Sequence, residues 1–82
     1  MNKRIGFVGI IVENRLQSSP EVNRVLSEAG EMILARVGLP YRERGVSVIT
    51  LVIEATTDEL GALTGRLGAL DGVSVKSALA KP

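Results

Sequence analysis

The segment Gly38-Leu-Pro-Tyr-Arg-Glu-Arg-Gly45 decides the fold, because it joins two strand-like runs in the middle of the chain. The run before it contains Met32-Ile-Leu34, and the run after it is Val46-Ser-Val-Ile-Thr-Leu-Val-Ile-Glu54. Both runs are apolar and too short for a typical helix. Glycines at the ends of the octet and three consecutive charges after its tyrosine are typical of a hairpin connection. The sequence therefore predicts two consecutive strands, Glu31–Val37 and Val46–Glu54, joined by this octet.

A helix is predicted on each side of this pair of strands. Ser18-Ser-Pro-Glu21, after a polar loop at 14–17, has the serine, proline and glutamate that favour a helix start. Thr56-Thr-Asp-Glu59 is a second capping-box pattern, and its helix is predicted to run to about Leu70. Helical spacing predicts the buried stripes: Val22, Val25, Leu26 and Ala29 in the first helix, and Leu60, Leu63, Leu67 and Leu70 in the second.

Two further strands complete the pattern. Arg4–Glu13 is rich in β-branched residues, and Val73–Leu79 follows the turn Asp71-Gly72. The order is β-α-β-β-α-β, which predicts a single α+β domain over residues 1–82 with the ferredoxin-like fold. Right-handed crossovers then give a four-stranded antiparallel sheet of order 4-1-3-2, with both helices on one face.

Composition removes several classes of function. The chain has neither cysteine nor histidine, so disulfides and thiolate or imidazole metal sites are impossible. No calcium-loop spacing is present, and the glycines of Gly6-Phe-Val-Gly9 fall inside a strand instead of in the turn that a dinucleotide fingerprint requires. We expect no cofactor, and because nothing marks a catalytic base or cleft, we expect a protein that is not an enzyme.

The charge and hydropathy of the chain argue against nucleic acid and membranes as binding partners. Ten basic and nine acidic residues give a net charge of +1, and the only aromatic residues are one Phe and one Tyr. Nucleic-acid binders usually concentrate basic residues and stacking aromatics on one face, so we expect no direct nucleic-acid binding. The apolar run Ile5–Val12 is too short to span a bilayer. We therefore expect no membrane association and a cytoplasmic location.

One face of the predicted sheet needs a cover. In the third strand, Val48, Thr50 and Val52 alternate away from the larger residues that should pack under the helices. A second subunit would cover this face, so we expect a homo-oligomer, a dimer or tetramer, with these three residues in its interface. Alternatively, the β-branched residues merely favour a strand and tolerate exposure. The outward face of the second helix, with Gly61, Gly65 and Gly68, permits close approach of a partner or is a surface that tolerates small residues.

A candidate binding site lies at one end of the sheet. The topology brings the loop after the first strand, the hairpin octet and the Asp71-Gly72 turn to the same end, and the first helix begins there. Arginines, a phenol and a helix N-terminus suit a carboxylate or phosphate. Alternatively, the glutamates pair with the arginines in a plain solvated loop, or the loop reaches a neighbouring subunit. The candidate ligand- or partner-binding residues are Glu13, Asn14, Arg15, Tyr41, Arg42 and Arg44.

Three segments carry a family resemblance: the opening strand Arg4–Glu13, the octet Gly38–Gly45 and the ending Gly72–Leu79. They resemble the iron-only hydrogenase system regulators, over essentially the whole chain. That family is similar in fold to ACT domains and to the C-terminal domain of nickel-responsive repressors, which oligomerise and bind small effectors. The resemblance implies an ACT-like regulatory module with an anionic effector or a protein partner in a regulatory pathway.

The sequence departs from these families at two points that affect which of their ligand-binding features can be expected here. ACT domains commonly have a glycine in the loop after the first strand, where the effector binds, whereas this chain has Asn14-Arg-Leu-Gln17. Nickel-responsive repressors use histidine and cysteine ligands, which this chain lacks. The sequence thus favours a stand-alone regulatory module that oligomerises and senses a small effector. The alternative is a structural or protein-interaction domain with no small-molecule ligand.

Overall fold

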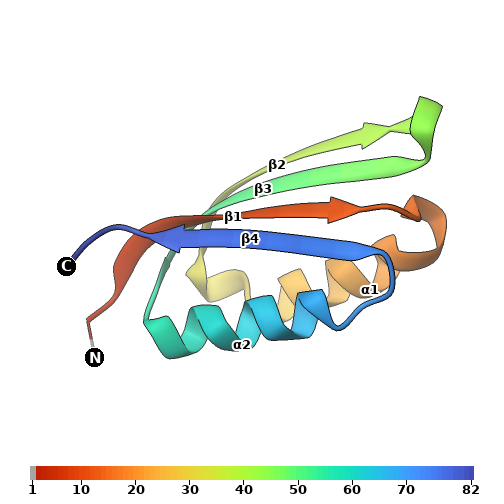
Figure 1. Cartoon of the computed structure of the whole chain (residues 1–82). Helices are drawn as coiled ribbons and strands as arrows, with labels where there is room; N and C mark the ends of the chain where they lie inside the picture. The colour runs from red at the N-terminus through yellow and green to blue at the C-terminus, as the bar shows by residue number, and fades with distance from the viewer. Residues whose placement is uncertain (1) are drawn as a thin grey trace.

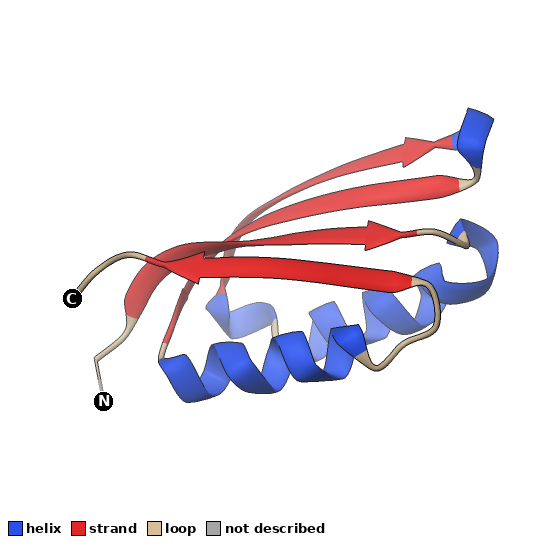
Figure 2. Ribbon diagram, viewed as in Figure 1, coloured by secondary structure: helices blue, strands red, loops and turns tan. Residues whose placement is uncertain are grey.

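The computed structural model describes residues 2–82, which form a four-stranded antiparallel sheet with two helices on one face (Figures 1 and 2). The elements are β1 (Arg4–Val12), α1 (Arg15–Glu28), β2 (Ile33–Tyr41), β3 (Val46–Ala55), α2 (Thr57–Gly68) and β4 (Val73–Leu79). The strand order is β2-β3-β1-β4, which is the predicted order 4-1-3-2 read from the other edge. The ferredoxin-like prediction is therefore confirmed.

The core lies between the helices and the two central strands. Alternate residues of β1 and β3 point toward the helices and are buried, whereas the residues between them are mostly exposed. The predicted helix stripes supply the other side of the core, with Ala29 and Leu70 only half-buried at its margin. The core residues with no exposed side-chain surface are Val8, Ile10, Val12, Val22, Leu51, Ile53, Ala55 and Leu67. Each large aliphatic side chain in this set contributes about 1.5–3 kcal/mol by its burial.

The first helix begins earlier than the sequence pattern indicated. Residues 14–17 were predicted to be a loop, but α1 starts at Arg15, and the Asn14 side chain accepts a hydrogen bond from the N–H of Gln17. The prediction that the serines cap the helix is wrong, since the Ser18 hydroxyl donates to the carbonyl oxygen of Asp71 at 2.9 Å. Pro20 consequently lies inside the helix. Asn14 is as good an N-cap as serine, which is why the local pattern allowed both positions.

The second strand extends into the octet. It was predicted over Glu31–Val37, but β2 spans Ile33–Tyr41, and residues 30–32 form a short 3₁₀ turn. The connection to β3 is consequently only Arg42–Gly45, with Gly45 in the left-handed region at φ 67° that glycine adopts without strain. Pro40 is accommodated because β2 is an edge strand, where a missing N–H donor is tolerated.

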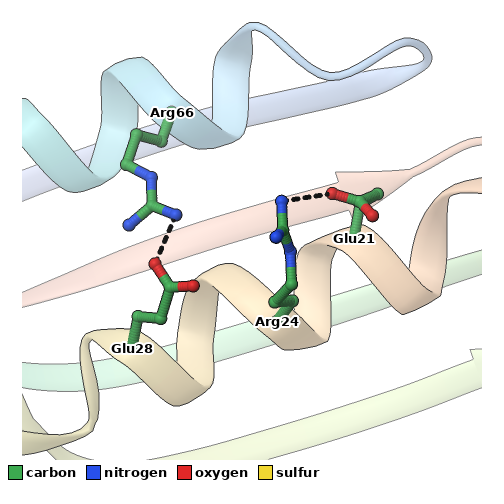
Figure 3. A network of polar contacts seen from close by, with 4 residues as sticks. All are labelled: Glu21, Arg24, Glu28 and Arg66. Carbon is green, nitrogen blue, oxygen red and sulfur yellow. Dashed lines mark hydrogen bonds and ion pairs between the residues drawn. The ribbon is translucent and has the colours of Figure 1, made fainter.

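The second helix and last strand agree with the prediction. Both hydrogen bonds of the Thr56–Glu59 capping box form, at 2.8 and 3.1 Å, and β4 has the predicted bounds Val73–Leu79. The two helices are joined by an ion pair between Arg66 of α2 and Glu28 of α1 at 2.6 Å, while Arg24 pairs with Glu21 within α1 (Figure 3). Within residues 2–82, no helix has both the length and the apolar character needed to cross a membrane.

Candidate functional site

Three connections meet at one end of the sheet, as predicted, and hydrogen bonds join them (Figure 1). The N–H of Glu13 donates to the carbonyl oxygen of Gly72 at 2.8 Å, and the N–H of Arg15 donates to that of Gly45 at 3.0 Å. The segment between β1 and α1 is therefore held between the hairpin tip and the α2–β4 turn. We call this end of the sheet, comprising residues 13–15, 41–45 and 71–72, the rim.

The rim arginines make no ion pair with the rim carboxylates. The two ion pairs found among residues 2–82 are Arg24–Glu21 and Arg66–Glu28, both in the helix layer. Glu43 accepts a long 3.5 Å hydrogen bond from the Tyr41 hydroxyl instead of pairing with Arg42 or Arg44. The local pairing that would make this hairpin tip a neutral loop is thus not formed in this structure.

The start of α1 has fewer free backbone N–H groups for binding an anion than the sequence suggested. Its first N–H groups were predicted to be unpaired, but the Arg15 N–H bonds to Gly45, and those of Gln17 and Ser18 bond to Asn14. Asn14 is therefore a capping residue, and its amide also donates to the Gln17 side chain at 2.7 Å. Positive charge at this rim comes mainly from the arginine side chains and not from free helix N–H groups.

The predicted site residues divide between the two faces of the sheet. Glu13, Tyr41 and Arg44 line a cavity of about 490 Å³ on the face without helices, which we call the rim cavity. Its remaining walls are apolar: Ile11, Leu39, Val46 and Val48. Arg15 instead lines a cavity of about 260 Å³ on the helix-covered face, and Arg42 lines neither of these two cavities. The six residues therefore share one end of the molecule but do not form one pocket.

The sheet face without helices, called the open face, is largely apolar. Val48 and Val52 are 38% and 39% exposed, and Thr50 between them is also exposed, so the predicted set does face away from the helices. The register continues this surface onto both neighbouring strands, because Val52 lies opposite Phe7 of β1 and Thr50 opposite Val37 of β2. The exposed large apolar residues of β1 and β2 on this face are Ile5, Phe7, Ile11, Val37, Leu39 and Tyr41.

Sequence reasoning named the open face on one strand and missed its extent. In β1 the alternation was visible, since Ile5, Phe7 and Ile11 are out of phase with the buried Val8 and Ile10. In β2 the same alternation was hidden, because the octet was assigned to the connection instead of to the strand. A strand continued to Tyr41 would have placed Leu39 and Tyr41 on this face.

Comparison with known proteins gives one family and several similar folds. Residues 4–77 match the TM1266-like family, described as "Iron-only hydrogenase system regulator, putative". The structure of the uncharacterized protein TM1266 from Thermotoga maritima is 42% identical, with a TM-score of 0.91, over 96% of this chain and 99% of that one. No curated protein sequence matches the chain.

Two more distant structures share the fold alone. The ACT domain of GTP pyrophosphokinase from Chlorobium tepidum is 22% identical, with a TM-score of 0.79, over 93% of this chain and 99% of that one. The nitrogen regulatory PII-like protein CPII from Thiomonas intermedia, bound to ADP, AMP and bicarbonate, is 15% identical, with a TM-score of 0.53. The match covers 95% of this chain and 91% of that one. The ACT-like fold and the family resemblance of the sequence are thereby confirmed. By its match over residues 4–77 and its 42% identity to TM1266, the chain belongs to the TM1266-like family.

Proposed function

We propose that the protein is an ACT-like regulatory module that self-associates through its open face and senses a small anionic effector at the rim. The family description supports regulation. The PII-like neighbour, which is bound to ADP, AMP and bicarbonate, illustrates that a related fold holds small anions. That likeness is one of fold alone, and only the rim residues of this chain support an effector site here.

The rim cavity is the single observation that carries the effector proposal. Its apolar walls come from three strands, since Val48 lies opposite both Ile11 and Leu39 in the sheet. Arg44 and Tyr41 stand beside these walls and supply a cation and a phenolic hydroxyl, with the Glu13 carboxylate also in the lining. Small-molecule sites commonly combine apolar walls with a few polar groups that fix orientation. We propose that the effector places an anionic group near Arg44 and a short apolar part against Val48.

Self-association would complete the rim cavity. A contiguous apolar surface over three strands is unusual on a monomer and marks an interaction surface. A second copy is the proposed occupant, because the exposed residues from Phe7 through Val52 and Thr50 to Val37 carry no charge that would select a different partner, and Lys76 of β4, opposite Gly9, lies beside this stretch. A stable interface buries about 1,200–2,000 Å² in total, which is within reach of a four-stranded face. A copy placed there would also shield the rim cavity from solvent.

A protein-interaction domain without a small ligand is the second candidate. The exposed face of α2 favours it, since a Cβ added at Gly61, Gly65 or Gly68 would meet no heavy atom within 4 Å. Gly61 and Gly65, inside the helix, each destabilise it by about 0.8–1 kcal/mol relative to alanine. A solvated helix gains nothing from that cost, whereas a partner backbone could approach such a face closely.

A thermal-melting screen separates the two candidates. The protein is heated with amino acids, nucleotides and simple inorganic anions, and its unfolding temperature is compared with that of the free protein. A compound that binds only the folded state, present at ~100 times its Kd, adds roughly 2.7 kcal/mol of stability. The effector proposal predicts such a shift for at least one anionic compound. The interaction-domain alternative predicts no shift with any of them.

A further inference from the structure

The helix-covered side of the sheet contains a groove that the core does not fill. The groove has a volume of about 260 Å³, and it separates α1 from the edge strand β2. Figure 1 shows the β2–β3 hairpin rising away from the helix layer toward its tip. Its lining residues are Arg15, Ser19 and Asn23 of α1, Arg36, Gly38, Leu39 and Pro40 of β2, and Ser47 and Ile49 of β3. We call this space the α1–β2 groove.

Two regular spacings build its walls. Arg15, Ser19 and Asn23 recur every four residues, so they form one stripe along α1 beside the apolar stripe. In β2, alternate residues share a face, and the register places Gly38 opposite Ile49 and Pro40 opposite Ser47. Where β1 and β3 present aliphatic side chains to the helices, β2 presents Arg36, Gly38 and Pro40. Between β2 and α1, a groove with polar walls and the apolar side chain of Ile49 therefore takes the place of tight packing.

The groove has the chemistry of an oxyanion site. The Arg36 guanidinium donates to the Asn23 side-chain oxygen at 2.5 Å, which holds it across the groove toward α1. That bond uses one of the five N–H donors of the guanidinium. Arg15 lies on the helix wall, and the hydroxyls of Ser19 and Ser47 add neutral donors. None of the described residues that line the groove is an aspartate or a glutamate.

We propose that the α1–β2 groove binds a small oxyanion, a carboxylate or a phosphate, at the Arg36 guanidinium, with Arg15 adding positive charge to the same groove. Two guanidinium groups with no lining carboxylate favour an anion, because charge-assisted hydrogen bonds from arginine to such oxygens are the strong ones. The volume lies below the roughly 300–1,000 Å³ typical of drug-sized ligands, so the ligand is a small metabolite or an inorganic ion. This site is on the opposite face of the sheet from the rim cavity and goes beyond the proposed function.

Amide chemical shifts measure the binding directly. The ¹⁵N-labelled protein is titrated at constant ionic strength with inorganic phosphate in one series and with acetate in another. The proposal predicts saturable shifts at the amides of Arg36, Gly38 and Ser47 with at least one probe. The series with the lower Kd identifies phosphate or carboxylate as the ligand group. Shifts that stay linear in both series overturn the proposal.

Three variants locate the site. Arg36→Gln should weaken binding about tenfold or more, because it removes a charge-assisted contact. Gly38→Phe should block binding by filling the groove, since a Cβ at Gly38 meets no heavy atom within 4 Å and Gly38 lines the groove. Arg24→Gln is the matched control, because Arg24 is an exposed arginine of α1 that does not line the groove.

The outcomes separate the two proposed sites. Loss of binding in Arg36→Gln and Gly38→Phe, with Arg24→Gln unchanged, supports the groove. Full binding in both Arg36→Gln and Gly38→Phe overturns the groove and leaves the rim proposal standing. Circular dichroism of each variant shows whether it is folded. Because the Arg36 side chain is exposed, Arg36→Gln is expected to fold. This variant therefore still tests the groove if Gly38→Phe does not fold.

Discussion

The backbone N–H of Arg15 donates a 3.0 Å hydrogen bond to the carbonyl oxygen of Gly45, which attaches the first turn of α1 to the tip of the β2–β3 hairpin. Gly45 adopts the left-handed φ of 67° as the chain enters β3. The hairpin tip is therefore held by backbone groups. The side chains of Arg42 and Arg44 take no part in that attachment. They can therefore be substituted to test binding without removing the hydrogen bond that holds the hairpin tip.

The double variant Arg42→Ala/Arg44→Ala should fold normally and lose the anion response of the rim. Both residues are exposed, so the free energy of unfolding should change by less than about 1 kcal/mol. Chemical denaturation measures that quantity, and the melting screen measures the response to anionic compounds. A variant that unfolds, or one that keeps the full response, contradicts the assignment of these arginines to binding.

Two glycine substitutions should have opposite effects. A Cβ at Gly6 would lie 2.2 Å from the carbonyl oxygen of Ala78, so Gly6→Ala must displace β4 or β1 and should destabilise the protein. Gly65→Ala adds a methyl group to open space on α2 and should stabilise the isolated chain by about 0.8–1 kcal/mol. Urea denaturation of the two variants measures whether the free energy of unfolding falls in Gly6→Ala and rises in Gly65→Ala. Destabilisation by Gly65→Ala would instead indicate that the α2 glycine face is occupied by a partner.

The capping box of α2 should make stability fall in acid. The N–H of Thr56 donates to the Glu59 carboxylate at 2.8 Å, and this bond is the main cause that lowers the pKa of Glu59 below its ordinary value of 4.5. Because the folded-state pKa is the lower one, the stabilisation is complete above pH 4.5 and is lost as the pH falls through the folded-state pKa. The stability advantage of wild type over Glu59→Gln should therefore shrink across that window. A difference that stays constant with pH would contradict this role.

The fold was predictable because its signals are local and repeated. The capping box at Thr56, the alternation in β3 and the leucine stripe of α2 each specify one element, and the order of elements then specifies the sheet. The start of α1 was not predictable in the same way, since Asn14 and the serines are comparable caps. Tertiary contacts decide between them: the Ser18 hydroxyl is engaged by Asp71, which is distant in sequence.

The sequence predicted that the candidate residues share one end of the sheet, but it did not predict how they divide between the two faces. Topology alone brings Glu13, Arg15 and Tyr41 to one end of the sheet. Which face each side chain occupies depends on strand register, and the extent of β2 past Gly38 could not be read from an octet that contains glycine and proline. Arg36 was missed for a related reason, because a single charge in a strand carries no signal until its partner, Asn23, is known.

Sedimentation of the wild type and of Thr50→Arg tests the central claim, self-association through the open face, most directly. Thr50 is exposed at the centre of that face, opposite Gly9 of β1 and Val37 of β2. An arginine there would bring an unpaired charge into the interface and weaken association by several kcal/mol. Ser27→Arg, on the exposed surface of α1, is the matched control. We predict that wild type and Ser27→Arg sediment as a dimer or larger at micromolar concentration and that Thr50→Arg shifts toward monomer. A monomeric wild type, or a Thr50→Arg variant that stays fully assembled, would contradict the claim.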